Sequence, residues 1–343
     1  MHPRGFAVTT QGACIFDPLG PRLTRQEQKF FGRVTPFGFI LFARNIKSAG
    51  QVKALCRELR DAAGHDAPVL IDQEGGRVQR LKAPTWREWP TPLEHVRASG
   101  GRAWDVMYLR YRIIAAELRD LGIDSNCAPL VDVATPETHS FLTDRCYGFD
   151  ARDVADIGRA VSDGLLHGGV LPVLKHMPGH GRATEDSHKG LPVVTAAHDA
   201  LGAEDFLPFS ELADLPMGMT AHVVYTAMDS RPATLSPVVM AAIRDEIGFD
   251  GLVMTDDLSM NALEGTLADR AIRARAAGCD VVLHCNGDLA QKEQVADAAG
   301  RLTGVGAQRA ARALSWRRDP DTVDISQLEE KLDSAMRGLS NGC

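Results

Sequence analysis

The segment from Lys175 to Gly181, followed by Asp186-Ser187-His188, concentrates reactive side chains in a short stretch of chain. Its fourteen residues contain three histidines, two glycines and one proline, directly after an apolar run. The Pro-Gly pair at 178–179 interrupts any helix, so His176 and His180 cannot form a pair on one helical face. A polar loop at the end of a buried strand is a usual place for catalytic groups, and we expect this segment to be one.

The composition is that of an ordinary folded protein, with 44% hydrophobic and 24% charged residues in 343, which favours neither disorder nor membrane insertion. A net charge of -7 without a basic block argues against nucleic-acid binding. A secretory h-region and an apolar run of eighteen residues are both missing, which predicts a cytoplasmic protein. The seven cysteines show no C-x-x-C spacing, which favours reduced thiols over disulfides or a zinc ribbon.

Eight short apolar segments have the length and composition of buried strands. Most are continuous apolar runs rather than alternating ones, as in parallel strands that are covered on both faces. The predicted strands are Ala13–Phe16, Gly38–Phe42, Val69–Asp72, Asp124–Val133, Val170–His176, Met217–His222, Gly251–Asp256 and Asp280–Cys285.

Helix signals separate these strands. Thr24 and Glu27 have the spacing of a capping box, and Ser236-Pro237 is typical of an N-cap followed by a proline in the first turn. Glycines that follow helical stretches, shortly before the next strand, predict helix ends at Gly64, Gly122, Gly168 and Gly278.

The alternation of strands and helices predicts a single α/β domain, a TIM-type (β/α)8 barrel that covers residues 1–343. A helical C-terminal segment, about 317–343, is expected to pack on it. A doubly wound open sheet is the alternative fold. That alternative is weakened because neither G-x-G-x-x-G nor a P-loop motif follows any predicted strand.

Charged and polar side chains stand at the carboxyl ends of five predicted strands, where a barrel of this type has its active site. Each one alone is explained equally well as a solvated ion pair. Together they indicate an occupied polar pocket. These residues are Asp72, Glu74, Arg77, Arg80, Asp132, Arg145, Lys175, His176, His222, Asp256 and Asp257.

The residue types in this set suit a sugar better than a phosphate. Arg80 and Arg145 can form forked hydrogen bonds, and Asp72 can accept from two neighbouring hydroxyls. Phosphate recognition would need more cations and fewer carboxylates. Four Trp and four Tyr provide few stacking platforms, which favours a pocket for one or two sugar units over a long cleft.

The chain resembles the family three glycoside hydrolases, and among them the single-domain bacterial β-N-acetylhexosaminidases of peptidoglycan recycling. The resemblance runs through ordered motifs along nearly the whole chain. They are Gly38–Asn45, Asp72–Arg80, Ala128–Val133, Lys175–Gly181 with Asp186-Ser187-His188, Met219–Val223, Gly248–Gly251 and Thr255–Met260.

The resemblance implies roles for individual residues. Asp256 would be the nucleophile, His188 the general acid/base and Asp186 its orienting partner. Spacing alone does not distinguish Asp256 from Asp257, and the choice follows the family. The N-acetylglucosamine ring would be bound by Asp72, Arg80, Arg145, Lys175 and His176.

The implied function is that of a retaining exo-β-N-acetylglucosaminidase, which forms a covalent glycosyl intermediate on Asp256. Its expected substrate is N-acetylglucosaminyl-1,6-anhydro-N-acetylmuramic acid, with or without peptide, from cell-wall turnover. The family implies no metal and no cofactor, and we expect a monomer with no nucleic-acid or membrane partner. Arg182, where the family more often has Asp, could add a contact to an anionic substrate.

Four other interpretations stay open at this point. His176, His180 and His188 could ligate a metal in a hydrolase, although the chain has no H-x-H motif. A histidine acid/base does not repel phosphate, so the enzyme could be a phosphorylase. A substrate-assisted mechanism would make Asp256 an orienting group. A non-enzymatic sugar-binding barrel is disfavoured because Asp256, Asp186 and His188 are all present.

Overall fold

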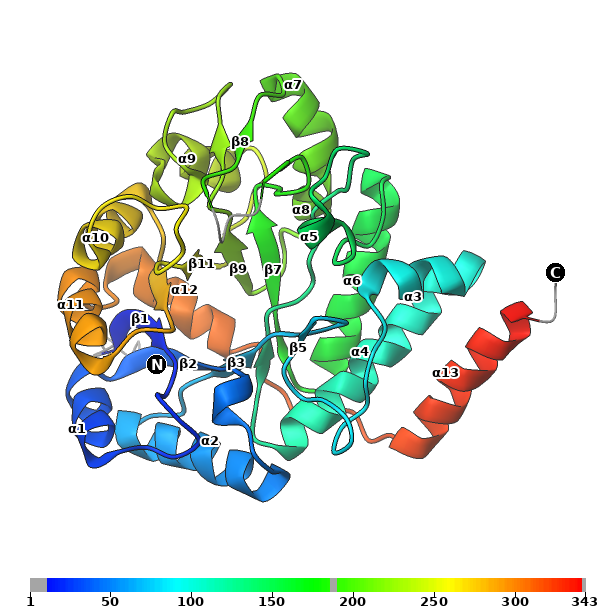
Figure 1. The fold of residues 1–343 in the computed structure, drawn as a ribbon, viewed down its shortest axis with the longest axis horizontal. Coiled ribbons are helices and arrows are strands. Elements are labelled where there is room, and N and C mark those ends of the chain that lie inside the picture. The colour runs from blue at the N-terminus through cyan, green and yellow to red at the C-terminus, as the bar shows by residue number, and fades with distance from the viewer. Residues whose placement is uncertain (1–10, 186–189, 341–343) are drawn as a thin grey trace, which may run out of the picture.

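Eight parallel strands close into a barrel in the computed structural model of the chain, which describes residues 11–185 and 190–340 (Figure 1). The predicted (β/α)8 barrel is therefore confirmed. In order around the barrel the strands are β1 (Gly12–Phe16), β12 (Val281–His284), β11 (Leu252–Asp257), β9 (Met217–Thr220), β7 (Leu171–Met177), β6 (Ser125–Asn126), β3 (Val69–Ile71) and β2 (Pro36–Leu41).

Helices surround the barrel on its outer side (Figure 1). The longer ones are α1 (Arg25–Val34), α2 (Ala49–Ala63), α3 (Pro92–Ser99), α4 (Ala103–Asp120), α6 (Ala151–His167), α9 (Pro237–Asp245), α10 (Leu267–Ala277), α11 (Leu289–Ala299), α12 (Gly304–Leu314) and α13 (Ile325–Ser340). Shorter helical turns are η1 (Ala43–Asn45), η2 (Gly100–Arg102), α5 (Ser140–Thr143), α7 (His198–Ala200), η3 (Leu201–Asp205), α8 (Leu207–Glu211) and η4 (Ala233–Leu235). Two small sheets, β4 (Gln73–Gly75) with β5 (Val78–Gln79) and β8 (Val193–Val194) with β10 (Val224–Tyr225), lie outside the barrel sheet.

The predicted capping signals act as expected. Thr24 and Glu27 form a reciprocal capping box at the start of α1, and the Ser236 side chain accepts from the Val239 amide at the start of α9. Gly64 and Gly278 end α2 and α10 in the left-handed conformation that glycine adopts without a steric penalty.

Two hydrophobic layers follow from the alternation of side chains along each strand. In β1, Ala13 and Ile15 belong to the cluster inside the barrel, whereas Cys14 and Phe16 belong to the cluster between strands and helices. Successive strand residues point to opposite faces, so residue parity decides which side chains reach the barrel interior. At the carboxyl ends of β3 and β11, the same parity directs Asp72 and Asp256 toward the site.

The fourth predicted strand is wrong in its extent. Only Ser125–Asn126 forms a regular ladder, whereas the prediction ran from Asp124 to Val133. Pro129 has no amide hydrogen to donate, so a regular ladder cannot pass through it. The chain still follows β7 by single bonds, including Lys175 N–H to the Pro129 carbonyl at 3.0 Å. Asp132 therefore projects from a connecting segment and not from a strand end.

The C-terminal helix α13 packs against α4 and α3, on the side of the barrel that Figure 1 shows at the right. Leu328, Leu332 and Ala335, at helical spacing along one face, are buried in this contact. Within residues 11–185 and 190–340, no helix is both long and apolar enough to cross a membrane.

Candidate active site

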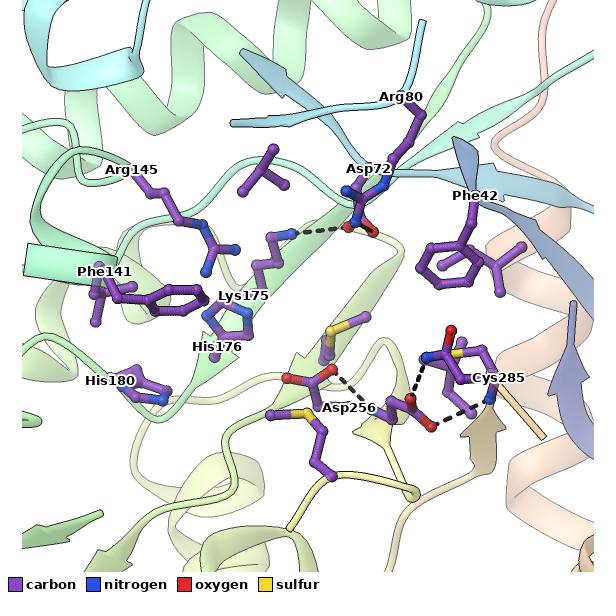
Figure 2. Close-up of a pocket in the computed structure, with 18 of the residues that line it drawn as sticks. Phe42, Asp72, Arg80, Phe141, Arg145, Lys175, His176, His180, Asp256 and Cys285 are labelled. Carbon is purple, nitrogen blue, oxygen red and sulfur yellow. Dashed lines mark hydrogen bonds and ion pairs between the residues drawn. The ribbon is translucent and has the colours of Figure 1, made fainter. Parts of the chain in front are cut away.

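A cavity of about 280 Å³ opens where the barrel strands end. This is small for a ligand pocket, since such pockets are usually roughly 300–1,000 Å³. Its lining includes the predicted site residues Asp72, Arg80, Arg145, Lys175, His176 and Asp256 (Figure 2). Asp186 and His188 lie outside the described residues, so their roles stay predictions.

Strand parity directs Asp256 into the cavity. Leu252 and Met254 of β11 belong to the cluster inside the barrel, whereas Val253 belongs to the outer one. Asp256 continues the inward series, and Figure 2 shows its carboxylate at the edge of the cavity. One of its oxygens accepts the backbone N–H of Asp257 at 2.7 Å.

The surroundings of Asp256 keep its carboxylate ionised. Burial by itself would raise the pKa of this group. The facing side chains of His222 and His176 and the Asp257 amide outweigh that effect and lower the pKa to about 2. The group is therefore an anion at neutral pH, as a nucleophile must be.

Asp257 borders the same cavity, but both of its carboxylate oxygens are already occupied. One accepts the backbone N–H groups of Ser259 and Cys285 at 3.0 and 3.1 Å. The other accepts the Ser259 hydroxyl at 2.6 Å and the Asn286 amide at 3.1 Å. Asp257 thus ties the end of β11 to the segment after β12, whereas Asp256 borders the cavity and accepts the Asp257 amide.

Three cations and two carboxylates form an ion-pair network on the other side of the cavity. Arg145 donates two hydrogen bonds to Glu74, at 2.8 and 2.9 Å. Lys175 lies 2.6 Å from Glu74 and 3.3 Å from Asp72. Arg80 pairs with Asp72 at 2.9 Å. Arg80 and Arg145, the forked donors expected to bind a sugar, therefore already use some of their hydrogen bonds on Asp72 and Glu74.

This network holds its members in their charged forms. Burial raises the pKa of Asp72, but Lys175 and Arg80 outweigh it and leave the pKa below its usual value. Burial lowers the pKa of Lys175, yet Glu74 and Asp72 raise it above the ordinary value. Lys175 therefore presents a full positive charge to the cavity although its side chain is only 2% exposed.

A second buried carboxylate, Asp132, fixes the orientation of His176. Asp132 is fully buried and accepts from His176 Nδ1 at 2.8 Å. It also accepts the backbone N–H groups of His176 and His180, at 3.2 and 2.7 Å. Because Nδ1 donates to a carboxylate, Nε2 is the ring nitrogen left for a ligand. Burial lowers the pKa of His180, which also lines the cavity, to about 4, so this side chain is neutral.

A local irregularity lets both Lys175 and His176 reach the cavity. Val173 points into the barrel, so alternation alone would direct Lys175 inward and His176 outward. The register between β7 and β9 shifts between Leu174 and Met177. A bulge of this kind re-aims side chains and often lies next to active sites.

Two phenylalanines form apolar walls on opposite sides of the cavity in Figure 2. The Arg77 guanidinium carbon lies 3.8 Å from the Phe141 ring centroid, and that of Arg145 lies 5.6 Å from it. Arg80 lies over the Phe42 ring at 5.3 Å. These arginine contacts stiffen rings that suit the C–H faces of a sugar.

The sequence profile of the Glycosyl hydrolase family 3 N terminal domain matches residues 22–312. The chain belongs to this family. A β-hexosaminidase of Methylococcus capsulatus is 35% identical over 308 residues, which cover 88% of this chain and 91% of that protein. One of Thioalkalivibrio sulfidiphilus is 38% identical over 288 residues, 80% and 81% of the two chains.

Solved structures of family members have the same overall fold as this chain. NagZ from Neisseria gonorrhoeae superimposes with a TM-score of 0.83 at 27% identity, over 97% of this chain and 99% of that one. A family 3 β-N-acetylglucosaminidase from Paenibacillus gives a TM-score of 0.81 at 30% identity, over 94% of this chain and 67% of that one. The protein is a glycoside hydrolase with a family 3 barrel.

Several residues of this family 3 site had no role in the sequence interpretation. Glu74 and Asp132 were noted only as charged residues near strand ends, and Phe42, Phe141 and Asn286 were not considered. The Asp-x-Glu spacing of residues 72–74 is a signal for Glu74. Side chains that are two positions apart lie on the same face of an extended chain, so Glu74 should lie near Asp72. No comparable signal marks Phe141, which reaches the cavity from the short helix α5.

Residues 179–182, which lead toward Asp186, form hydrogen bonds and ion pairs with neighbouring elements. The Tyr225 hydroxyl donates to the Gly179 carbonyl at 2.7 Å, and Thr138 donates to the Gly181 carbonyl at 2.5 Å. Arg182 is engaged by Asp205 at 2.6 Å and by Glu204. The suggested contact between Arg182 and an anionic substrate is therefore not favoured by the structure.

The described histidines near the cavity have different partners: His176 is oriented by the Asp132 carboxylate, whereas the His222 ring contacts the Thr234 hydroxyl at 2.7 Å and the Asp257 backbone carbonyl at 3.0 Å. His176 pairs with Asp132, and its ring lies edge-on to His180 with 5.7 Å between centroids. Among the residues that the structure describes, no three His, Cys, Asp or Glu side chains are placed to hold a metal ion.

Proposed function

We propose that this family 3 hydrolase is a retaining exo-β-N-acetylglucosaminidase that uses Asp256 as its nucleophile. The observation that carries the proposal is the position of Asp256, which faces the cavity as an ionised carboxylate with a pKa of about 2. Its neighbour Asp257 is occupied by four donors. Curated relatives that carry the name β-hexosaminidase support the activity.

The size and lining of the cavity support cleavage of a single terminal sugar. About 280 Å³ accommodates one sugar ring rather than an extended oligosaccharide. Carboxylate and cation side chains around Asp72 and Lys175 offer acceptors and donors to ring hydroxyls. The N. gonorrhoeae NagZ solved in complex with N-trifluoroacetyl-D-glucosamine supports an N-acylated glucosamine in this position.

In the proposed first step, an Asp256 oxygen attacks the anomeric carbon while the bond to the leaving oxygen breaks. The His188 imidazolium, oriented by Asp186, gives its proton to that oxygen. In the second step, neutral His188 takes a proton from water as the water oxygen attacks the anomeric carbon. Asp256 leaves as a carboxylate, and two inversions give net retention.

The proposed natural substrates are peptidoglycan fragments, N-acetylglucosaminyl-1,6-anhydro-N-acetylmuramic acid with or without peptide. The likeness to NagZ over nearly the full length of both chains supports this choice.

The test is hydrolysis of an aryl β-N-acetylglucosaminide by wild type and by Asp256→Ala and His188→Ala variants, with a chelator present. Wild type should release N-acetylglucosamine with or without phosphate. His188→Ala should lose about 10² to 10⁴ in rate on natural fragments and much less on a good aryl leaving group.

The outcomes separate the alternatives. Equal losses of His188→Ala on good and poor leaving groups would remove the acid/base assignment. A sugar 1-phosphate as product would make the protein a phosphorylase, and inhibition by the chelator would revive a metal mechanism.

A further inference from the structure

We propose that Glu74 is a positioning residue for sugar binding, which fixes Arg145 and Lys175 together in the wall of the cavity. The proposal rests on the proposed function, because it assumes that these two cations contact the sugar. Both cations line the cavity, whereas Glu74 is 1% exposed and lies behind them. Glu74 therefore acts through its neighbours.

Glu74 uses both carboxylate oxygens to set two cation positions. Oε2 accepts Arg145 Nε at 2.9 Å, and Oε1 accepts Arg145 Nη2 at 2.8 Å. Lys175 Nζ lies 2.6 Å from the same Oε1. A forked pair leaves the guanidinium little freedom to rotate. The shared oxygen fixes the distance between the two cationic groups.

Without a shared anion, the two cations would repel one another. Arg145 lowers the pKa of Lys175, which is the direction expected for like charges held close together. Both side chains are almost fully removed from water, with 10% and 2% exposure. Water therefore screens their repulsion poorly. The Glu74 carboxylate allows both cations to remain at one wall of a small cavity.

The backbone around Glu74 is built to hold its side chain in place. The Glu74 carbonyl accepts from the buried Arg110 guanidinium and from the Tyr111 hydroxyl. Gly75 follows with a φ of 121°, and a Cβ there would lie 1.9 Å from Arg110 Nη2. Glycine at this position allows the arginine to approach the chain beside Glu74.

A purely structural role is the competing explanation, because any buried ion pair that loses one partner destabilises a fold. Asp280 provides a matched control. It is 4% exposed, and it pairs with Arg244 at 2.8 Å and Arg309 at 3.4 Å. It immediately precedes β12, so it lies at the opposite end of the barrel from the cavity.

The experiment measures kcat/KM for an aryl β-N-acetylglucosaminide in a double-mutant cycle. Glu74→Gln should lower kcat/KM by about 10- to 100-fold, the effect of one or two charged hydrogen bonds. Lys175→Met should lower kcat/KM by a clearly smaller factor in the Glu74→Gln background than in wild type, because the lysine is already displaced. In the Asp280→Asn background, Lys175→Met should lower kcat/KM by the same factor as in wild type.

The pH profile gives a readout that loss of stability alone would not move. In the proposed mechanism His188 sets the alkaline limb of kcat/KM, so the limb that belongs to Lys175 is measured in a His188→Ala background with a good aryl leaving group. Since Glu74 helps to raise the pKa of Lys175, the alkaline fall in that background should begin at lower pH when Glu74→Gln is added and be unchanged when Asp280→Asn is added. Glu74→Asp keeps the charge and should recover part of the activity. If Glu74→Gln does not fold, Glu74→Asp takes its place in the cycle.

Independent effects of Glu74 and Lys175 in the cycle, or a Glu74 variant within about twofold of wild type, would overturn the proposal. These results are distinct from failure of the proposed function. If wild type prefers another aryl glycoside, the N-acetylglucosaminidase assignment fails, and the same cycle run with that glycoside still tests Glu74.

Discussion

Separate replacement of Asp256 and Asp257 by alanine should affect two different properties of the protein. Asp257→Ala removes the acceptor of four donors, including the backbone N–H groups of Ser259 and Cys285. The two side-chain donors can turn to other partners, but the two backbone groups cannot. At about 1–3 kcal/mol for each buried unsatisfied group, the free energy of unfolding should fall by about 2–6 kcal/mol.

That loss can be read as a shift in thermal unfolding. An unfolding entropy of about 2.1 cal/mol/K per residue gives about 0.7 kcal/mol/K for 343 residues. The expected fall in midpoint for Asp257→Ala is therefore about 3–8 °C. Asp256→Ala removes one acceptor, that of the Asp257 amide, and should shift the midpoint by less.

The activity of the two variants should show the opposite order. Loss of a covalent nucleophile removes a whole reaction path, so Asp256→Ala should lose on the order of 10⁴ or more in kcat. Added azide should restore turnover in this variant and give an α-glycosyl azide, because a small anion can take the place of the missing carboxylate. Asp257→Ala should remain clearly more active, with no azide effect.

The assay combines thermal unfolding with release of an aryl leaving group, measured on both variants at one pH. The reasoning is refuted if Asp257→Ala abolishes turnover and responds to azide while Asp256→Ala stays active. It is refuted equally if Asp257→Ala unfolds at the wild-type temperature, because its hydrogen bonds would then carry no stability.

Two further predictions concern the carboxylates of Asp132 and Asp256. Asp132→Asn removes the charged acceptor of His176 Nδ1, so kcat/KM should fall by about 10- to 100-fold, and an unchanged value would show that His176 is oriented by other contacts. The depressed pKa of Asp256, about 2 against an ordinary 3.8, means that this group stays ionised until the pH approaches 2 and contributes stability that is lost only below about pH 4. The kcat/KM profile from pH 8 to 3.5 should therefore contain no acid limb from Asp256, and a limb near pH 4 that moves in Asp256→Glu would contradict this.

Much of the architecture could be predicted because its signals are local. A continuous apolar run of four to seven residues between turn signals favours a buried strand, and the Thr24 side chain accepts the backbone N–H of Glu27 at the start of its own helix. The prediction went wrong at residues 127–133, where apolar composition continued but Pro129 could not join a ladder. There the backbone donor pattern outweighed hydrophobicity.

The site was less predictable because its decisive contacts join residues that are distant in sequence. The choice between Asp256 and Asp257 depends on Cys285 and Asn286, which reach Asp257 from the next strand of the barrel. The pairing of Glu74 with Arg145 depends on a loop 71 residues away. A sequence shows that such groups exist, but only the closed barrel determines which donor meets which acceptor.

The burial of Lys175 explains why carboxylates are needed beside it. Removing Lys175 from water favours its neutral form, but Glu74 and Asp72 outweigh this effect and raise its pKa above the ordinary value. The same ion pairs fix its position in the structure, so in the proposed mechanism little reorganisation would be needed when charge develops on the sugar. Replacing Glu74, Arg145 and Lys175 together by apolar residues could therefore stabilise the fold, whereas removing Glu74 alone would leave two repelling cations. If the two cations bind the sugar as proposed, their need to stay charged and fixed in position explains why the barrel keeps a network that is costly for stability.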